Sequence, residues 1–139
     1  SDENYFNDLN TIRNEVYNIT GVKSRIIRLP GGSSNTISRK YNKGIVTRIT
    51  TKLNENDFYY FDWNIDSEDA SGKVSKECIY QNVTNRIHNG TNIVLMHDSS
   101  TKITTVEALR DIIKYAKNNG YTFAKITKKT PQIHHHINN

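Results

Sequence analysis

The segment NIVLMHD, Asn92 to Asp98, decides the expected fold, because a short continuous apolar run stops abruptly on a histidine and a carboxylate. Runs of this kind are typical of strands buried on both faces of a parallel sheet. Two earlier segments have the same form, RIIRLPGG from Arg25 to Gly32 and YFDWNIDSED from Tyr60 to Asp69. If all three are parallel strands, an arginine, several carboxylates and a histidine meet at one carboxyl edge, where α/β enzymes place their active sites. The pattern therefore indicates a hydrolytic active site.

Helical and extended patterns alternate along the chain. Apolar side chains at helical spacing predict helices over Asp2 to Thr20, about Ser38 to Asn54, from Ser75 to a stop at Asn89-Gly90, and from Thr104 to a stop at Asn119-Gly120. Ser75 is the expected cap of the third helix, and TTVE, residues 104–107, resembles a capping box at the start of the fourth. In the first helix the residues at helical spacing are Phe6, Leu9, Ile12, Val16 and Ile19. The expected buried faces are Ile79, Val83 and Ile87 in the third helix, and Val106, Leu109, Ile112, Ile113 and Ala116 in the fourth.

A strand is expected after each helix, over residues 25–29, 58–65, 93–96 and 121–126. Three of the four helices end in a glycine before the strand, which favours αβ units. The sequence thus predicts an α/β fold of four helix-strand units with a mostly parallel sheet. We expect one domain over residues 1–126 and a surface tail over residues 127–139, in which His134 to His136 are a disordered stretch or capture a metal adventitiously.

Composition limits the classes of partner. The 19 basic and 14 acidic residues give a formal net charge of +5, but the basic residues are scattered and form no stripe for nucleic acid. Attraction to an anionic surface such as a cell wall stays open. Cys78 is the single cysteine, so no disulfide framework or cysteine metal site is expected. No apolar run has the length of a membrane span, and Ser1 begins no signal-like segment.

Three motifs resemble those of a known family. RLPGG from Arg28, DSED from Asp66 and LMHD from Leu95 resemble, in this order, the third, fourth and fifth motifs of polysaccharide deacetylases, carbohydrate esterase family 4. These metal-dependent enzymes remove N-acetyl or O-acetyl groups from peptidoglycan, chitin or xylan. The resemblance implies that the chain is the C-terminal part of a distorted (β/α) barrel, and that the parent enzyme is extracellular or in the cell envelope.

The resemblance also implies a role for each motif residue. In the family a metal-bound water attacks the acetamide carbonyl, a carboxylate acts as base, and a histidine protonates the leaving amine. Arg28 would pair with the base carboxylate, His97 would be the general acid, and Asp69 would hold and orient that histidine. Asp66 competes with Asp69 for this orienting role. The substrate would be contacted by Pro30, by Gly31 at the oxyanion and by Leu95 at the acetyl methyl group.

The chain departs from the family pattern in two ways. Asp69 is followed by Ala70 where the family usually has tryptophan, so one wall of the substrate groove differs. The first two motifs, an Asp-Asp pair and a His-x-x-x-His, do not occur, although they supply the base and the metal ligands. We therefore expect the parent enzyme to bind a divalent metal such as zinc, and this chain to hold none and to be inactive alone. The missing N-terminal half or a second copy of the chain is the expected partner.

Less specific interpretations remain for the same residues. His97 can be a satisfied core histidine, and RLPGG can be a plain strand-to-loop turn. One alternative function is a non-catalytic carbohydrate-binding or interaction module on the same scaffold. Another is a phosphate- or nucleotide-binding module that uses the backbone N–H groups after Gly31 and Gly32.

Overall fold

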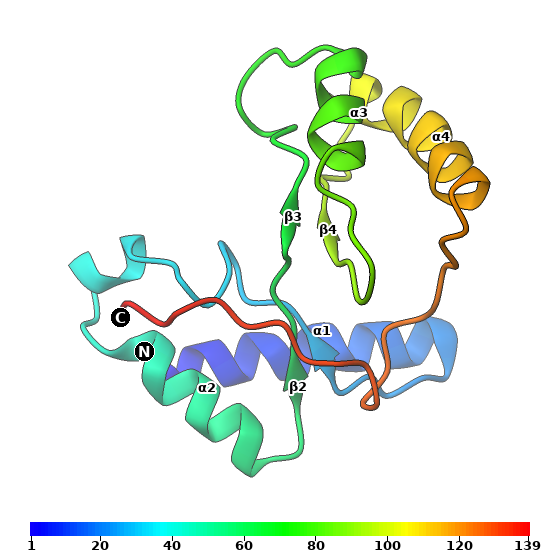
Figure 1. Cartoon of the computed structure of the whole chain (residues 1–139). Coiled ribbons are helices and arrows are strands. Elements are labelled where there is room, and N and C mark those ends of the chain that lie inside the picture. The colour runs from blue at the N-terminus through cyan, green and yellow to red at the C-terminus, as the bar shows by residue number, and fades with distance from the viewer. The chain divides into compact units, whose positions relative to one another are not determined.

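The computed structural model describes residues 1–139 and divides into two compact units, shown in Figure 1. Unit 1 comprises Ser1–Asp62 and Ile126–Asn139, and unit 2 comprises Trp63–Lys125. The architecture is α/β, with four α-helices and short parallel strands. In chain order the elements are α1 (Asp2–Thr20), β1 (Ile26–Ile27), the 3-10 helix η1 (Ile37–Lys40), α2 (Ile45–Glu55), β2 (Tyr59–Tyr60), β3 (Ile65–Asp66), α3 (Lys76–Thr84), β4 (Val94–Leu95) and α4 (Ile103–Asn118).

Unit 1 is built around α2 and a parallel pair of strands. β1 pairs with β2 in a register that aligns Ile26 with Tyr59 and Ile27 with Tyr60. The spacing of three and four residues along α2 places one apolar stripe against these strands. The buried cluster consists of Leu29, Val46, Ile49, Leu53 and Tyr60. This cluster fixes the strand that leads into the RLPGG motif.

The N-terminal part of α1 packs on this cluster through Tyr5, Phe6 and Leu9. The apolar residues farther along the helix lie in solvent, since Ile12 is 59% exposed and Ile19 is 84% exposed. The helix ends at the predicted glycine, where Gly21 adopts a left-handed conformation with φ of 70° and donates to the Tyr17 carbonyl. The predicted extent of α1 is thus confirmed.

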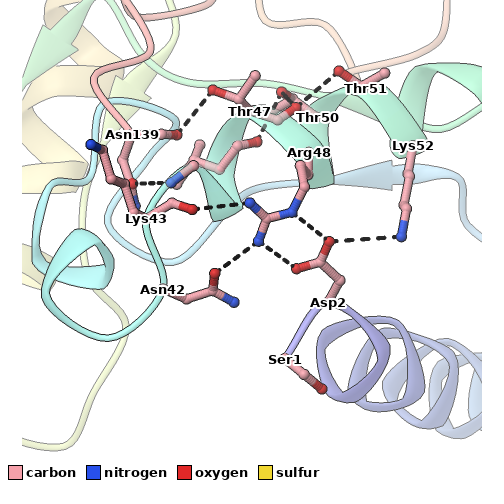
Figure 2. A network of polar contacts seen from close by, with 12 residues as sticks. Ser1, Asp2, Asn42, Lys43, Thr47, Arg48, Thr50, Thr51, Lys52 and Asn139 are labelled. Carbon is pink, nitrogen blue, oxygen red and sulfur yellow. Dashed lines mark hydrogen bonds and ion pairs between the residues drawn. The ribbon is translucent and has the colours of Figure 1, made fainter.

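Polar contacts hold the last residue of the chain against α2 (Figure 2). The main-chain oxygen of Asn139 accepts the Thr47 N–H at 2.9 Å, and its Oδ1 accepts the Gly44 N–H at 2.7 Å. Gly44 is the N-cap residue and has no side chain to satisfy these N–H groups, so Asn139 takes over the capping role. Residues 127–139, expected as a surface tail, therefore end in specific contacts within unit 1.

Figure 2 also shows how the start of α1 is fixed to α2. Both carboxylate oxygens of Asp2 accept from the Arg48 guanidinium, each at 2.9 Å. Lys52 lies 3.7 Å from the same carboxylate. The hydrogen bonds from Arg48 are the main cause of the lowered pKa of Asp2, opposed by slight burial.

Unit 2 contains the second parallel pair. β3 pairs with β4, aligning Ile65 with Val94 and Asp66 with Leu95. Figure 1 shows α3 and α4 next to each other at one end of these strands. The buried cluster consists of Ile65, Ile79, Val83, Ala108 and Ile112. This packing fixes the two loops that leave β3 and β4, which carry the DSED and LMHD motifs.

The helix starts in unit 2 were predicted with mixed success. Ser75 caps α3 as expected, because its hydroxyl accepts the Cys78 N–H at 3.2 Å. The capping box predicted at residues 104–107 is wrong, since α4 already begins at Ile103 and its N-cap, Lys102, makes no side-chain cap bond. The predicted buried face is also wrong in part. Val106 is 67% exposed and Leu109 is 41% exposed, whereas Ile112 and Ala116 are buried.

The single predicted sheet is replaced by two two-stranded sheets. The expected strand over residues 58–65 is divided into β2, which ends at Tyr60, and β3, which begins at Ile65. Between them the Asp62 N–H donates to the Ile133 carbonyl at 2.8 Å. The expected helix over residues 38–54 is interrupted at Gly44, whose φ of 75° lies outside the helical region. Residues 121–126 form no strand. No helix is long and apolar enough to span a membrane.

Candidate active site

In unit 2 the loop after β3 and the loop after β4 bring Asp69 and His97 into contact. The His97 ring nitrogen Nδ1 lies 2.7 Å from Asp69 Oδ1, and the His97 main-chain N–H donates to Asp69 Oδ2 at 2.8 Å. A carboxylate can only accept hydrogen bonds, so Nδ1 carries the proton. The Asp69 side chain is 0% exposed and that of His97 is 45% exposed. The other ring nitrogen, Nε2, is therefore the one that can exchange a proton with a substrate.

Two residues at the start of α4 hold Asp69 in place. The Thr105 hydroxyl donates to Asp69 Oδ2 at 3.0 Å, and the Lys102 ammonium donates to the Asp69 main-chain carbonyl. Burial by itself raises the pKa of Asp69, but the hydrogen bonds from the His97 ring, the His97 N–H and Thr105 outweigh it. The net effect is a lowered pKa, so Asp69 is a carboxylate at neutral pH.

Asp66, the competing candidate, does not contact His97. Its Oδ1 accepts the Glu68 N–H at 2.8 Å, which closes the turn of the DSED loop. Glu68 adopts a φ of 59°, a conformation uncommon for a residue with a side chain. Arg86, two residues after the end of α3, secures this turn, because it donates to the Asp66 carbonyl at 2.8 Å and to Glu68 Oε1 at 2.7 Å. Of the two carboxylates, the structure places Asp69 against the histidine.

In unit 1 the RLPGG motif forms a tight turn. The Gly32 N–H donates to the Leu29 carbonyl at 2.9 Å. Gly31 has a φ of 71°, and a Cβ added there would lie 3.1 Å from Asn35 Nδ2. The same Asn35 amide donates to the Pro30 carbonyl at 3.1 Å. Both the backbone conformation and the space at position 31 therefore favour glycine.

The Arg28 side chain of the same motif contacts the neighbouring strand region, because its Nε donates to the Phe61 carbonyl at 3.4 Å.

Asp62 is a functional candidate that the sequence analysis did not single out. It is 0% exposed, and its Oδ1 accepts the Ser33 N–H at 2.8 Å. Its Oδ2 accepts the Ser33 hydroxyl and, at 2.9 Å, the His135 N–H. Burial by itself raises the pKa of Asp62. The hydrogen bonds from Ser33 and His135 lower the pKa by a larger amount, so the net pKa is below its usual value. An isolated aspartate inside an aromatic run was the available sequence signal.

The histidines of the tail have structural contacts of their own. The His134 ring stacks on the Tyr60 ring with centroids 3.8 Å apart and an interplanar angle of 7°. His134 Nε2 also lies 2.9 Å from the Tyr60 carbonyl. His135 Nδ1 lies 3.2 Å from the Ser34 hydroxyl. Together with Asp62, these contacts bind the tail to β2 through His134 and to the loop that follows RLPGG through His135.

The predicted site residues fall into both units. Arg28, Pro30 and Gly31 lie in unit 1, and Asp66, Asp69, Leu95 and His97 lie in unit 2. Within unit 2, Leu95 is the last residue of β4 and precedes His97 by one residue. The convergence of the two sets on one edge stays a prediction.

Comparisons with known proteins decide the family. No family model matches the chain. The catalytic domain of a peptidoglycan N-acetylglucosamine deacetylase from Eubacterium rectale ATCC 33656 has a TM-score of 0.94 and 39% identity, over 100% of this chain and 63% of that one. A mutant of a CE4 family pseudoenzyme, with restored enzymatic activity, has a TM-score of 0.65 and 27% identity, over 87% of this chain and 39% of that one. YheN of Bacillus subtilis strain 168, named as a polysaccharide deacetylase, is 28% identical over 132 residues, which are 91% of this chain and 43% of YheN.

The chain belongs to the CE4 polysaccharide deacetylase family. It spans less than two thirds of each of these relatives, from 39% to 63% of their lengths. This deacetylase segment therefore represents part of the fold that the solved catalytic domains contain. CE4 enzymes are metal-dependent, but the chain has no group of three or more His, Cys, Asp or Glu residues that could hold a metal ion. The residues of this segment do not fit the metal of the CE4 family.

Proposed function

We propose that the whole protein, meaning the deacetylase to which this chain contributes, hydrolyses N-acetyl or O-acetyl groups on a polysaccharide such as peptidoglycan, outside the cell or in its envelope. The observation that carries the proposal is the hydrogen-bonded pair of Asp69 and His97, which lies in two motifs that match the family. The 39% identity to a peptidoglycan N-acetylglucosamine deacetylase supports the substrate class. In this proposal the chain is the C-terminal part of a distorted (β/α) barrel.

His97 is the proposed general acid. Hydrolysis of an acetamide releases acetate and an amine, and the amine is a poor leaving group until its nitrogen is protonated. The Nδ1 proton of His97 is engaged by Asp69 at 2.7 Å, so the proton for the leaving nitrogen comes from Nε2. Asp69 stays ionised because its pKa is lowered, and it stabilises the imidazolium before the transfer.

The other motif residues are assigned to binding and charge. Arg28 pairs with the carboxylate base of the complete site, and the Gly31 N–H donates to the oxyanion. Pro30 and Leu95 contact the substrate, with Leu95 at the acetyl methyl group. The divalent metal, zinc in this proposal, and its ligands belong to parts of the whole protein outside these 139 residues. This division explains why the chain alone is expected to be inactive.

The test is acetate release from N-acetylglucosamine oligomers, measured for the 139-residue chain and for the whole protein, each with and without added zinc. We expect zinc-dependent release from the whole protein and none from the chain. Arg28→Ala in the whole protein should lower kcat about 10²-fold or more, with little change in thermal stability. Release by the chain alone, or none by the whole protein with zinc, would overturn the proposal.

A second candidate is a non-catalytic carbohydrate-binding or interaction module. The absence of a group of metal ligands in the chain favours it, as does the match to a CE4 family pseudoenzyme. This candidate predicts that the whole protein binds N-acetylglucosamine oligomers in calorimetry but releases no acetate with zinc. Binding and acetate release, both measured with N-acetylglucosamine oligomers, therefore distinguish the two candidate functions.

Exposed apolar side chains indicate a further partner. Ile12 and Ile19 on α1, and Ile103 and Val106 on α4, are each more than half exposed, at 59%, 84%, 66% and 67%. We propose that the rest of the deacetylase domain covers these faces, with a second copy of the chain as the alternative. The chain covers 63% of the catalytic domain from Eubacterium rectale, which leaves room for such a segment. Light scattering of the whole protein and of the chain distinguishes these two partners. A dimer of the chain is predicted only if a second copy of the chain covers the apolar faces.

A further inference from the structure

We infer that Thr105 and Lys102, at the start of α4, are positioning residues for His97: they fix Asp69 so that its Oδ1 faces the Nδ1 of the histidine ring. Neither residue lies in the motifs that match the family. The inference rests on the proposed role of His97 as general acid. It extends the candidate site from two loops to the first turn of a helix.

Thr105 differs from Thr50 and Thr84, the other two buried threonines in helices of this chain. In a helix, a threonine hydroxyl commonly donates to the carbonyl four residues earlier. Thr50 does so to Val46 at 2.9 Å, and Thr84 does so to Tyr80 at 2.9 Å. Thr105 is just as buried, with 4% exposed, but its hydroxyl donates to Asp69 Oδ2 at 3.0 Å. The hydroxyl therefore serves the carboxylate and not the local backbone.

The donors around Asp69 are divided between its two oxygens. Oδ2 accepts from the His97 N–H at 2.8 Å and from Thr105 at 3.0 Å, whereas Oδ1 faces the His97 ring at 2.7 Å. Two donors in different directions on Oδ2 prevent rotation of the carboxylate about its Cβ–Cγ bond. Oδ1 is thereby kept in line with Nδ1–H, and the ring orientation and its tautomer follow.

Lys102 restrains the backbone of the same residue. The Lys102 ammonium donates to the Asp69 main-chain carbonyl, and the Thr105 hydroxyl donates to the Asp69 carboxylate. The start of α4 therefore restrains both the backbone and the side chain of Asp69. The titratable or charged groups that contact Asp69 are His97 and the Lys102 ammonium. Arg86, two residues after the end of α3, is engaged by Glu68 and the Asp66 carbonyl. A loop residue in a turn that contains the positive φ of Glu68 needs such restraints to keep one orientation.

The test compares Thr105→Val, which keeps the shape and removes the hydroxyl, with Thr105→Ser, which keeps the hydroxyl. In the 139-residue chain, NMR follows the titration of the Asp69 carboxyl carbon and the Nδ1–H signal of His97. We expect Thr105→Val to raise the Asp69 titration midpoint by about 0.5 to 1 pH unit and to weaken the Nδ1–H signal. Thr105→Ser should leave both unchanged. An unchanged midpoint and Nδ1–H signal in Thr105→Val would overturn the inference, even if its melting temperature falls.

Lys102→Met provides a second variant that does not disturb the buried hydroxyl. It should broaden the Nδ1–H signal while the chain stays folded, and an unaltered signal would count against the role of Lys102. In the whole protein, Thr105→Val should lower kcat about tenfold at unchanged KM, and Thr105→Ser should restore it. If the NMR changes appear but the wild-type whole protein releases no acetate, the proposed function fails and the positioning role stands. If acetate is released but Thr105→Val matches wild type in both assays, the positioning role fails alone.

Discussion

Asp69 accepts two hydrogen bonds from His97, one from the ring Nδ1 at 2.7 Å and one from the main-chain N–H at 2.8 Å. The bond from the main-chain N–H fixes the position of the His97 backbone, and the bond from Nδ1 fixes the orientation of its ring. Because Asp69 is buried and His97 is half exposed, the pair presents one reactive nitrogen outward from a rigid base. This geometry is what a general acid requires.

Replacing Asp69 should impair catalysis much more than replacing its neighbour. Asp69→Asn in the whole protein leaves one amide oxygen where two carboxylate oxygens accept from the His97 ring, the His97 N–H and Thr105. The negative charge and one acceptor are lost, so the Nδ1–H tautomer is no longer held, and we expect kcat to fall about 10²- to 10⁴-fold. Asp66→Asn is the matched control, since Asp66 contacts the Glu68 N–H and not the histidine. It should retain kcat within a few-fold. Equal losses in both variants would return Asp66 to the role of orienting residue.

Acid should destabilise the folded chain through its two buried carboxylates. Asp62 and Asp69 both have lowered pKa values, so the folded state binds these protons less tightly than the unfolded state. Their contribution is complete above the unfolded-state pKa, about 3.9, and is lost as the pH falls through the lower folded-state pKa. Urea unfolding between pH 7 and pH 2 measures this decline. In the Asp62→Asn variant the free energy of unfolding should decline less steeply with falling pH than in wild type. Parallel curves would contradict a lowered pKa of Asp62 in the folded state.

Asn139 should stabilise unit 1 as a cap for α2. Asn139→Ala removes the acceptor for the Gly44 N–H and the donor to the Ser38 hydroxyl, and we expect it to lower the free energy of unfolding by about 1 kcal/mol. Asn138→Ala, at an exposed position, is the control and should change it by less than about 0.5 kcal/mol. Chemical denaturation of both variants measures the difference. Equal stabilities would show that the cap contributes nothing measurable.

A side chain at Gly31 should lower the free energy of unfolding by more than a side chain at Gly21 does. Gly31→Ala places a Cβ 3.1 Å from Asn35 Nδ2 at a φ of 71°. Gly21→Ala is a matched control, because Gly21 has a φ of 70° and nothing within 4 Å of an added Cβ. Both substitutions should destabilise by about 1 kcal/mol from backbone conformation, and Gly31→Ala by more because Asn35 must move. Denaturant midpoints that rank Gly21→Ala as the more damaging change would contradict this.

The Asp69–His97 contact was implied by the resemblance to the family motifs, with Asp66 as the competing partner, and the structure contains it. The sequence also predicted the extent of α1 and the Ser75 cap, which depend on local signals. It failed where a distant partner competes with a local one. The pattern of residues 104–107 predicts a cap, but Thr105 lies inside α4 and donates to Asp69, 36 positions earlier.

The same limit explains what the sequence did not show about Asp62 and the tail. Asp62 looks like part of a strand, yet its partners Ser33 and His135 are 29 and 73 positions away. Asn139 contacts Gly44 across 95 positions, and no local pattern encodes such a contact. The buried face of α4 was mispredicted in part for a related reason, since apolar spacing indicates a helix but does not reveal which part of its stripe a neighbour covers.

The most direct test of the central claim compares two substrates in the whole protein with zinc. His97→Asn keeps much of the shape of the ring but cannot protonate a leaving group. With an N-acetylglucosamine oligomer, whose amine must be protonated to leave, kcat should fall about 10²- to 10³-fold. With an aryl acetate, whose phenolate leaves unprotonated, kcat should change by only a few-fold. Equal losses on both substrates, or full activity on the oligomer, would contradict the assignment of His97 as the general acid.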